Sequence, residues 1–179
     1  MTGIALKEAR TTYGITQQGL GEMFNISGSM VSEIENGRRK LPKDIKPKAA
    51  RTLDDAQLYL TLAREATGGI GAPYLNRIDD HRVCCVMKLR EEVIEALNML
   101  EEVMPILLKA SGREGLQVRE LDRLKVTIIE IIESITAAQN TVARLAKAYG
   151  FSLADLWDEH EAKLIKSGYL EIEKDCPGR

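Results

Sequence analysis

The stretch of sequence that decides the fold of the N-terminal part is residues 16–37, TQQGLGEMFNISGSMVSEIENG. Thr16 and Ser27 have side-chain oxygens that can cap a helix, and each precedes a run with apolar residues at helical spacing. Asn25 lies between the two runs and tolerates the left-handed backbone conformation that a tight turn needs. Gly37 follows the second run and is a candidate for the helix end. The stretch therefore predicts two short helices joined by a turn centred on Asn25.

The second of these helices, expected over residues 28–36, has one apolar face and one polar face. Val31 and Ile34 face the preceding helix, where Gly21 is small enough for a close approach. The opposite face suits a helix whose N-terminal side chains contact base edges in the major groove. Basic side chains just beyond it can neutralise backbone phosphates. The expected DNA contacts are Gln17, Gln18, Ser27, Ser29, Ser32, Glu33, Asn36, Arg38, Arg39, Lys40 and Lys43.

The N-terminal part of the chain is basic and the remainder is acidic. Residues 1–51 contain nine Lys or Arg and five Asp or Glu, a net charge of +4, and six of the nine lie within residues 38–48. Residues 52–179 contain 16 basic and 22 acidic side chains, a net charge of −6, so the sum is the −2 of the whole chain. A basic head on an acidic body fits a head that binds a polyanion such as double-stranded DNA.

At these residues the chain resembles the helix-turn-helix domain of the λ-repressor-like (Cro/CI, XRE) regulators. The resemblance covers about 45–65 of the 179 residues and implies a sequence-specific DNA-binding domain. Two positions depart from the family pattern: Gly21 stands where Ala is commoner, and Gly28 lies near the start of the recognition helix, where it costs up to about 1 kcal/mol of helix stability. The matching positions are Thr16-Gln17, Leu20-Gly21, Asn25, Ile26-Ser27, Ser32, Ile34 and Glu35-Asn36-Gly37, followed by basic residues.

Further helices are predicted on both sides of this pair. Upstream we expect a helix over residues 4–13 with Ile4, Leu6 and Ala9 facing inward. Downstream we expect a short helix over residues 42–50, interrupted by Pro47, and a longer one over residues 54–66. Glycine and proline at residues 68–73 then break the helical pattern, so residues 67–82 are predicted to be a linker.

The second half of the chain is patterned for longer helices. Apolar residues recur every three or four positions over residues 83–110, where Pro105 is expected to kink or restart the helix. A helix of about 30 residues, about 45 Å long, follows and ends at Gly150. Ser152 is predicted to cap a last helix over residues 153–166, which Gly168 closes.

The long helix carries a heptad stripe of nine apolar positions from Leu121 to Tyr149. The stripe has two interpretations: it is the core of a monomeric bundle, or it is the seam of a dimer. DNA sites for helix-turn-helix proteins are commonly two-fold, which favours the dimer. The expected dimerisation residues are Leu121, Leu124, Ile128, Ile131, Ile135, Val142 and Leu145.

Glutamates cluster in the second half, with Glu91, Glu92 and Glu95 on one helix and Glu130 and Glu133 on another. This pattern distantly resembles the all-α nucleotide pyrophosphohydrolases of the MazG type, in which an E-E-x-x-E cluster and a later E-x-x-D bind Mg²⁺. Glu133 stands where that pattern has Asp, and a clear downstream set of basic and Asn residues is lacking. The resemblance implies a nucleotide hydrolase or a degenerate relative with a ligand pocket, whereas the simpler interpretation is a solvated helix face.

Other side chains argue against a zinc centre or a secreted protein. The three cysteines and two histidines have no zinc-ligand spacing, and Cys84-Cys85 is interpreted as two small core residues at a helix start. No apolar stretch approaches the roughly 20 residues that cross a membrane, and residues 1–10 have no signal-peptide core. We therefore expect a cytoplasmic protein that is not an enzyme, with no catalytic residue, no metal, no cofactor and no membrane partner.

Together these features predict an all-α protein in which a λ-repressor-like helix-turn-helix domain is followed by a helical bundle with one long heptad-patterned helix. The expected limits are 1–66 for the DNA-binding domain, 67–82 for the linker, 83–168 for a dimerisation or sensing domain and 169–179 for a tail. The predicted function is a dimeric, prophage- or mobile-element-type transcriptional repressor that binds a two-fold operator and responds to a protein or small-molecule effector. The alternatives are a MazG-like nucleotide-processing module and an antitoxin-type protein-interaction module, with the head serving for targeting or autoregulation.

Overall fold

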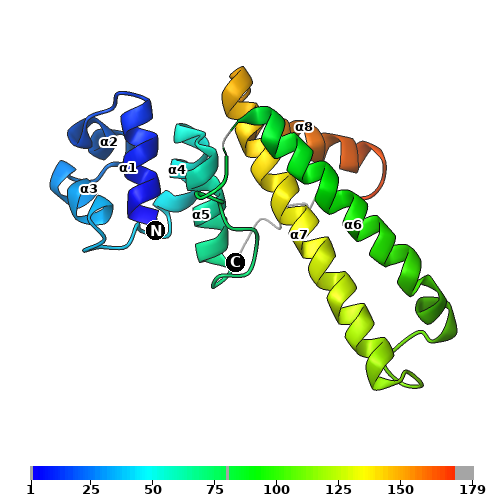
Figure 1. Cartoon of the computed structure of the whole chain (residues 1–179). Coiled ribbons are helices and arrows are strands. Elements are labelled where there is room, and N and C mark those ends of the chain that lie inside the picture. The colour runs from blue at the N-terminus through cyan, green and yellow to red at the C-terminus, as the bar shows by residue number, and fades with distance from the viewer. Residues whose placement is uncertain (1, 80, 172–179) are drawn as a thin grey trace.

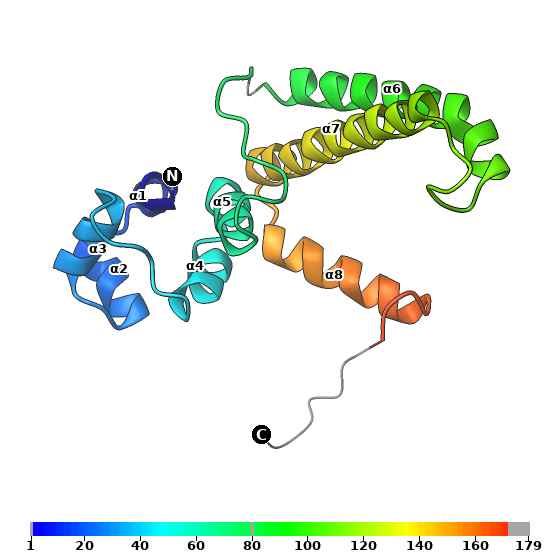
Figure 2. The same cartoon turned by 90° about the horizontal axis from the view of Figure 1, so that it is seen from below.

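The computed structural model describes residues 2–79 and 81–171; Cys176 and most of the expected tail lie outside these ranges. The described residues form helices and loops with no strand, so the all-α prediction is confirmed. Figure 1 shows a head of short helices from which two long antiparallel helices extend, and Figure 2 shows that α8 diverges from this pair. The helices are α1 (Thr2–Thr12), α2 (Gln17–Phe24), α3 (Gly28–Glu35), α4 (Ile45–Leu53), α5 (Ala56–Ala66), α6 (Arg82–Lys109), α7 (Val118–Tyr149) and α8 (Leu153–Lys166).

Helices α1 to α5 enclose one apolar core. Leu6, Leu20 and Ile34 are among its fully buried side chains. The inward orientation predicted for Ile4 is wrong, because 59% of its surface is exposed. The inward positions of α1 are Ala5, Leu6 and Ala9, which share one face of the helix at spacings of one, three and four.

The turn between α2 and α3 forms as its residues predict. The Thr16 hydroxyl accepts a hydrogen bond from the Gly19 amide at 3.0 Å, and the Ser27 hydroxyl accepts one from the Met30 amide at 3.1 Å. Asn25 adopts the left-handed conformation with φ of 56° and ends α2. Both caps satisfy amides that have no partner within their own helix, so the boundaries of α2 and α3 are locally encoded.

Two expected boundaries near α4 and α5 are wrong. Pro47 does not interrupt α4, because it lies in the first turn, where the missing N–H would have had no partner within the helix. Helix α5 starts at Ala56 rather than at residue 54, since Asp54 has φ of 43° and ends α4 instead. Asp55 caps α5 by accepting from the Leu58 amide at 2.8 Å.

Helices α6 and α7 form an antiparallel hairpin (Figure 1). Pro105 does not restart α6, which continues through it to Lys109. Gln117 and Glu120 form a capping box that starts α7, and Gly150, with φ of 70°, ends it as predicted. Ser152 caps α8 by accepting from the Asp155 amide at 3.1 Å, and the predicted bounds of α8 are correct.

The head is joined to the hairpin through α5 and α8. A second buried cluster contains Leu60 of α5, Ala143 and Ala146 of α7, and Leu153 of α8. The Asp54 carboxylate accepts from the backbone amides of Leu153 and Ala154 at 3.1 and 3.0 Å. Helix α5 contributes side chains both to this cluster and to the core of the head. The orientation of the head relative to the hairpin is therefore set by direct packing.

The segment between α5 and α6 is also held against α7. The Asn140 side chain accepts from the Leu75 amide at 2.9 Å and donates to the Pro73 carbonyl at 2.8 Å. Arg144 donates to the Leu75 carbonyl at 2.5 Å and lies 4.9 Å from the centre of the Tyr74 ring. This part of the predicted linker therefore lies along α7 as an ordered strap. Ile78, near the end of this segment, is 42% exposed.

The heptad stripe of α7 is only partly buried in the single chain. Five of its nine positions are half-buried: Leu121, Leu124, Ile131, Ala138 and Leu145. The buried residues of α7 are Thr127, Asn140, Thr141, Ala143, Arg144 and Ala146, and none of them belongs to the stripe. Ile128, Ile135, Val142 and Tyr149 of the stripe are instead exposed. Along the neighbouring helix α6, large apolar side chains such as Leu97 and Leu107 are exposed as well. Within the described residues, no helix is both long enough and apolar enough to cross a membrane.

Candidate nucleic-acid interface

Helix α3 presents a polar face to solvent. Ser29, Glu33 and Asn36 are exposed and Ser32 is half-buried, whereas Val31 and Ile34 are buried in the head. The Ser27 and Ser29 hydroxyls lie 2.9 Å apart, and the Asn36 amide donates to the Ser32 carbonyl at 2.8 Å. The α3 side chains that were predicted to contact DNA therefore lie on one polar surface.

The only acidic member of this surface, Glu33, is paired with a basic neighbour. Its carboxylate lies 3.5 Å from the Arg39 guanidinium, and both side chains are about half exposed. The Glu33 carbonyl also accepts from the Arg38 and Arg39 amides at 2.9 and 3.2 Å. The chain thus turns back over the end of α3 and brings Arg39 beside the acidic side chain, which reduces the repulsion a lone carboxylate would exert on phosphate.

The basic residues of the head divide into two groups. Lys46 pairs with Glu65 at 3.1 Å, Lys48 donates to the Met23 carbonyl at 2.7 Å, and Arg51 makes two hydrogen bonds to Asp158. These side chains hold the fold together. In contrast, the side chains of Arg38, Lys40 and Lys43 are exposed and have no ion pair within residues 2–79 and 81–171, so they remain available to phosphates at the edge of α3.

A buried ionic network lies on the inward side of α3, and it was not predicted from the sequence. Glu35 is only 5% exposed, and its carboxylate accepts from Arg10 Nε at 2.6 Å and from Gln17 Nε2 at 2.8 Å. Burial by itself would raise the pKa of Glu35, but the hydrogen bonds from Arg10 and Gln17 and the charge of Arg10 lower it overall. Glu35 therefore ties α1, α2 and α3 together as a charged group.

The same network includes Gln17, one of the expected DNA contacts. Its Nε2 donates to the buried Glu35 carboxylate, so its amide braces the neighbouring helix. Gln18 is exposed, and its amide donates to Glu22 at 3.3 Å. The signal for the network was present in the sequence as charged and amide residues at helix positions, but their shared interior location depends on how three helices pack.

Two glycines allow α2 and α3 to approach closely. A Cβ atom on Gly21 would lie 2.5 Å from the Ile26 carbonyl oxygen, and one on Gly28 would lie 3.1 Å from the Gln18 Cα atom. At both positions where the sequence departs from the family pattern, the glycine leaves room for backbone atoms that a larger residue would contact too closely. The cost of Gly28 to helix α3 is offset by contact between the first turns of α2 and α3.

The glutamates selected by the MazG-type pattern lie in the hairpin, away from α3. The structure brings Glu92, Glu130 and Glu133 together, so these are the described residues that could hold a metal ion. Glu91 and Glu95 are exposed and lie outside this group. Cys85 is buried as expected at the start of α6, but Cys84 is exposed, so the prediction for that pair is only half correct.

The short capped helices α2 and α3, the tight turn and the polar recognition face define a λ-repressor-like helix-turn-helix domain. A comparison with protein families agrees, since residues 6–54 match the model described as Helix-turn-helix. The search of curated proteins and the search of solved structures each found no match. The family match ends within the head, so the identity of the α6–α8 region rests on its own geometry.

Proposed function

We propose that this chain is a sequence-specific transcriptional regulator that binds double-stranded DNA through α3 and acts by binding rather than by catalysis. The observation that carries the proposal is the polar face of α3, bordered by the exposed side chains of Arg38, Lys40 and Lys43. Side chains on such a face can read base edges, while the basic edge neutralises phosphates. A regulator of this kind acts where the DNA is, so we expect a cytoplasmic protein.

We further propose that the regulator is a homodimer in which α6 and α7 of two chains pack together. A monomer rarely exposes so many large apolar side chains on two neighbouring helices, because their hydration is unfavourable. Ile128, Ile135 and Val142 on α7 and Leu97 on α6 are exposed, and the heptad spacing of α7 suits packing against a second helix. A second copy also supplies the second recognition helix that a two-fold operator requires.

Repression is the mode of regulation that we favour, in the style of prophage and mobile-element regulators. Occupancy of an operator by a compact dimer is sufficient to exclude other proteins from the same DNA, whereas activation needs an additional contact surface for the transcription machinery. A ligand or protein that binds the α6–α8 region could alter the spacing of the two heads, because α5 packs directly against α7 and α8.

Selection of bound sequences from a random DNA pool tests this function. The full chain is expected to enrich a two-fold motif whose half-sites are separated by about one helical turn of DNA, about 10 base pairs, or a multiple of it. Enrichment of no motif would contradict sequence-specific binding, and a single unrepeated half-site would contradict the dimer. Mg²⁺-dependent nucleotide turnover, or co-purification of a specific second protein, would favour an enzymatic or antitoxin-type role for the tail.

A further inference from the structure

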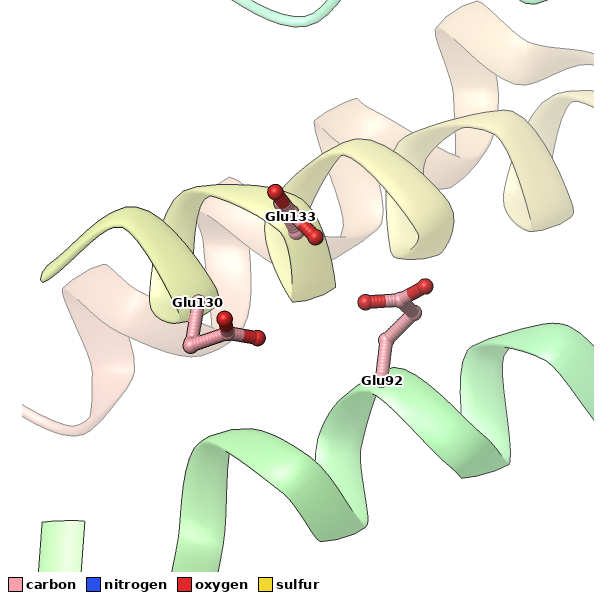
Figure 3. A group of neighbouring side chains, drawn as sticks. All are labelled: Glu92, Glu130 and Glu133. Atoms are coloured by element: carbon pink, nitrogen blue, oxygen red, sulfur yellow. The ribbon is translucent and has the colours of Figure 1, made fainter. Parts of the chain in front are cut away.

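Three carboxylates from α6 and α7 lie close together; Glu92 is buried, Glu130 is half-buried and Glu133 is exposed. Figure 3 shows Glu92 of α6 facing Glu130 and Glu133, which lie about one turn apart on α7. One oxygen atom from each side chain lies within 4.8 Å of the others. The group is formed by tertiary structure, because α6 and α7 bring together residues that are about forty positions apart in the chain.

Glu92 is the member of the group that has a buried oxygen atom without a hydrogen-bond partner among the described residues. It is only 7% exposed, and its Oε1 accepts from Lys88 Nζ at 2.7 Å. Its other oxygen, Oε2, is buried and has no hydrogen-bond partner among the described residues. A buried carboxylate oxygen without a donor is costly, so such an atom is expected to have a cation or a donor beside it.

The charge around the group is also unbalanced. Burial and the neighbouring charges of Glu133, Glu95 and Glu92 raise the pKa of Glu130. Within the described part of the chain, Lys88 is the one basic side chain that pairs with the group, and its own side chain is largely exposed. Three carboxylates with one partly solvated ammonium leave a local excess of negative charge.

We propose that Glu92, Glu130 and Glu133 bind a divalent cation that ties α6 to α7. Carboxylate oxygens are hard ligands and suit Mg²⁺ or Mn²⁺, which need several oxygen ligands around them. Glu92 and Glu133 also line a cavity of about 500 Å³, which provides room for water molecules to complete the coordination. The cation binds the Glu92 oxygen that lacks a donor and removes the repulsion between the two helices.

The role assigned to this cation is structural. It joins the middle of α6 to the middle of α7, where Ala96 and Thr127 are buried. A cation bound there offsets the repulsion among the three carboxylates and so stabilises the contact between the two helices.

Binding of Mn²⁺ to the full-length protein tests the site directly. Electron paramagnetic resonance measures the free Mn²⁺ signal, which the wild-type protein is expected to reduce at a stoichiometry of one ion per chain. Glu92→Gln and Glu133→Gln should weaken binding at least as much as the roughly 10–100-fold that follows loss of an outer-sphere partner. Glu101→Gln is the control, because Glu101 is an exposed glutamate of α6 that lies outside the group.

Thermal unfolding provides the second measurement. Without a cation, Glu92→Gln should melt at or above the temperature of the wild type, because it removes repulsion. With Mg²⁺ or Mn²⁺, the melting temperature of the wild type and of Glu101→Gln should rise, whereas that of Glu92→Gln should not. If Glu92→Gln fails to fold, Glu133→Gln carries the same comparison, since its side chain is exposed.

The proposal is overturned if the wild type leaves the free Mn²⁺ signal unchanged at millimolar protein and ion. It is also overturned if Glu92→Gln and Glu133→Gln bind Mn²⁺ as tightly as Glu101→Gln does. These results are independent of DNA binding, so the site and the function proposed above can fail separately.

Discussion

Glu35 links the charge state of one residue to the stability of the whole head. Its pKa is lowered because the hydrogen bonds from Arg10 and Gln17 and the charge of Arg10 outweigh the effect of burial. A carboxyl with a lowered pKa stabilises the folded state above its ordinary pKa, here 4.5, and loses that contribution as the pH falls through its folded-state pKa.

We therefore expect the free energy of unfolding to fall as the pH drops below about 4.5, and part of this fall should depend on Glu35. Urea unfolding between about pH 6 and about pH 3, followed by circular dichroism, measures it. Glu35→Gln keeps the size of the side chain but cannot ionise, so it should be less stable at neutral pH and show a shallower pH dependence. Identical slopes in the two proteins would contradict this assignment.

Glu33 is expected to determine base preference at one position of each half-site. A carboxylate near DNA is tolerated when it accepts from a cytosine amino group or orients an arginine, and Arg39 lies 3.5 Å away. Glu33→Gln should therefore change preference at one base pair by roughly 1–3 kcal/mol. Affinities for the selected site, its single-base variants and random DNA measure the effect.

The control for Glu33 is Asp44→Asn, which removes one exposed negative charge from the same head. It should tighten binding to all sequences slightly and equally. If Glu33→Gln behaves in the same uniform way, then Glu33 is only a solvated charge and takes no part in reading the sequence.

Arg38 and Arg39 are expected to contact phosphates. Replacing both by Ala should weaken binding to specific and random DNA alike and lower the slope of log affinity against log salt by about 1–2 per subunit. Titrations at several salt concentrations measure the slope. Replacing Lys163 and Lys166 on α8 by Ala removes the same charge outside both the recognition face and the proposed dimer surface, and should leave the slope nearly unchanged. A loss of specificity with an unchanged slope would show that the two arginines read bases instead.

At the scale of elements, the close approach of α2 and α3 depends on Gly21. Gly21→Ala would place a Cβ atom 2.5 Å from the Ile26 carbonyl oxygen, which is backbone and cannot easily move. We expect a loss of about 1–3 kcal/mol in the free energy of unfolding. Gly19→Ala, in the same helix, meets only side-chain atoms at 3.3 and 3.5 Å and should be neutral or stabilising. Equal stability of the two variants would show that α2 and α3 can separate without cost.

The boundaries of single helices were predictable wherever a cap determines them. Thr16, Ser27 and Ser152 each accept from an amide in the helix they start, and these helix starts were predicted correctly. The interruption predicted at Pro47 is wrong, and of the two outcomes expected at Pro105 the restart does not occur, because the effect of proline depends on its place in the helix and on what surrounds it. The hydrogen bonds of a helix cap can be predicted from sequence. Whether a helix continues through a proline, which lacks the backbone N–H donor, cannot be predicted in this way.

At the scale of the whole molecule, Ile135 reports on the proposed dimer. Ile135 is 47% exposed in the single chain, so Ile135→Asp should leave the helical content of the monomer nearly intact. In a dimer seam, the same change buries an unpaired charge and should cause dissociation. Sedimentation velocity should show a dimer for the wild type and a monomer for the variant.

Ile70→Asp is the matched control, because Ile70 is an exposed isoleucine outside α6 and α7. It should leave the association state unchanged. A wild-type protein that sediments as a monomer at micromolar concentration would contradict the dimer, and an Ile135→Asp protein that remains a dimer would place the interface elsewhere.

The sequence by itself determined the class of the head. Residues 16–43 contain the helix caps, the turn residue, the small residue and the basic edge, and these features interact over short distances along the chain. The pattern of residues 16–37 therefore specifies both the helix-turn-helix and its polar face. It also identified the heptad stripe, because helical periodicity relates position in the chain to position on a helix face.

Only the tertiary structure decided which distant residues meet. It placed Arg10 and Gln17 on Glu35, left Ile128, Ile135 and Val142 of the α7 stripe exposed, and brought Glu92, Glu130 and Glu133 together. Each of these outcomes depends on the rotation and axial offset of one helix against another. Those quantities arise from the packing of many side chains at once, and no local pattern in the sequence contains them.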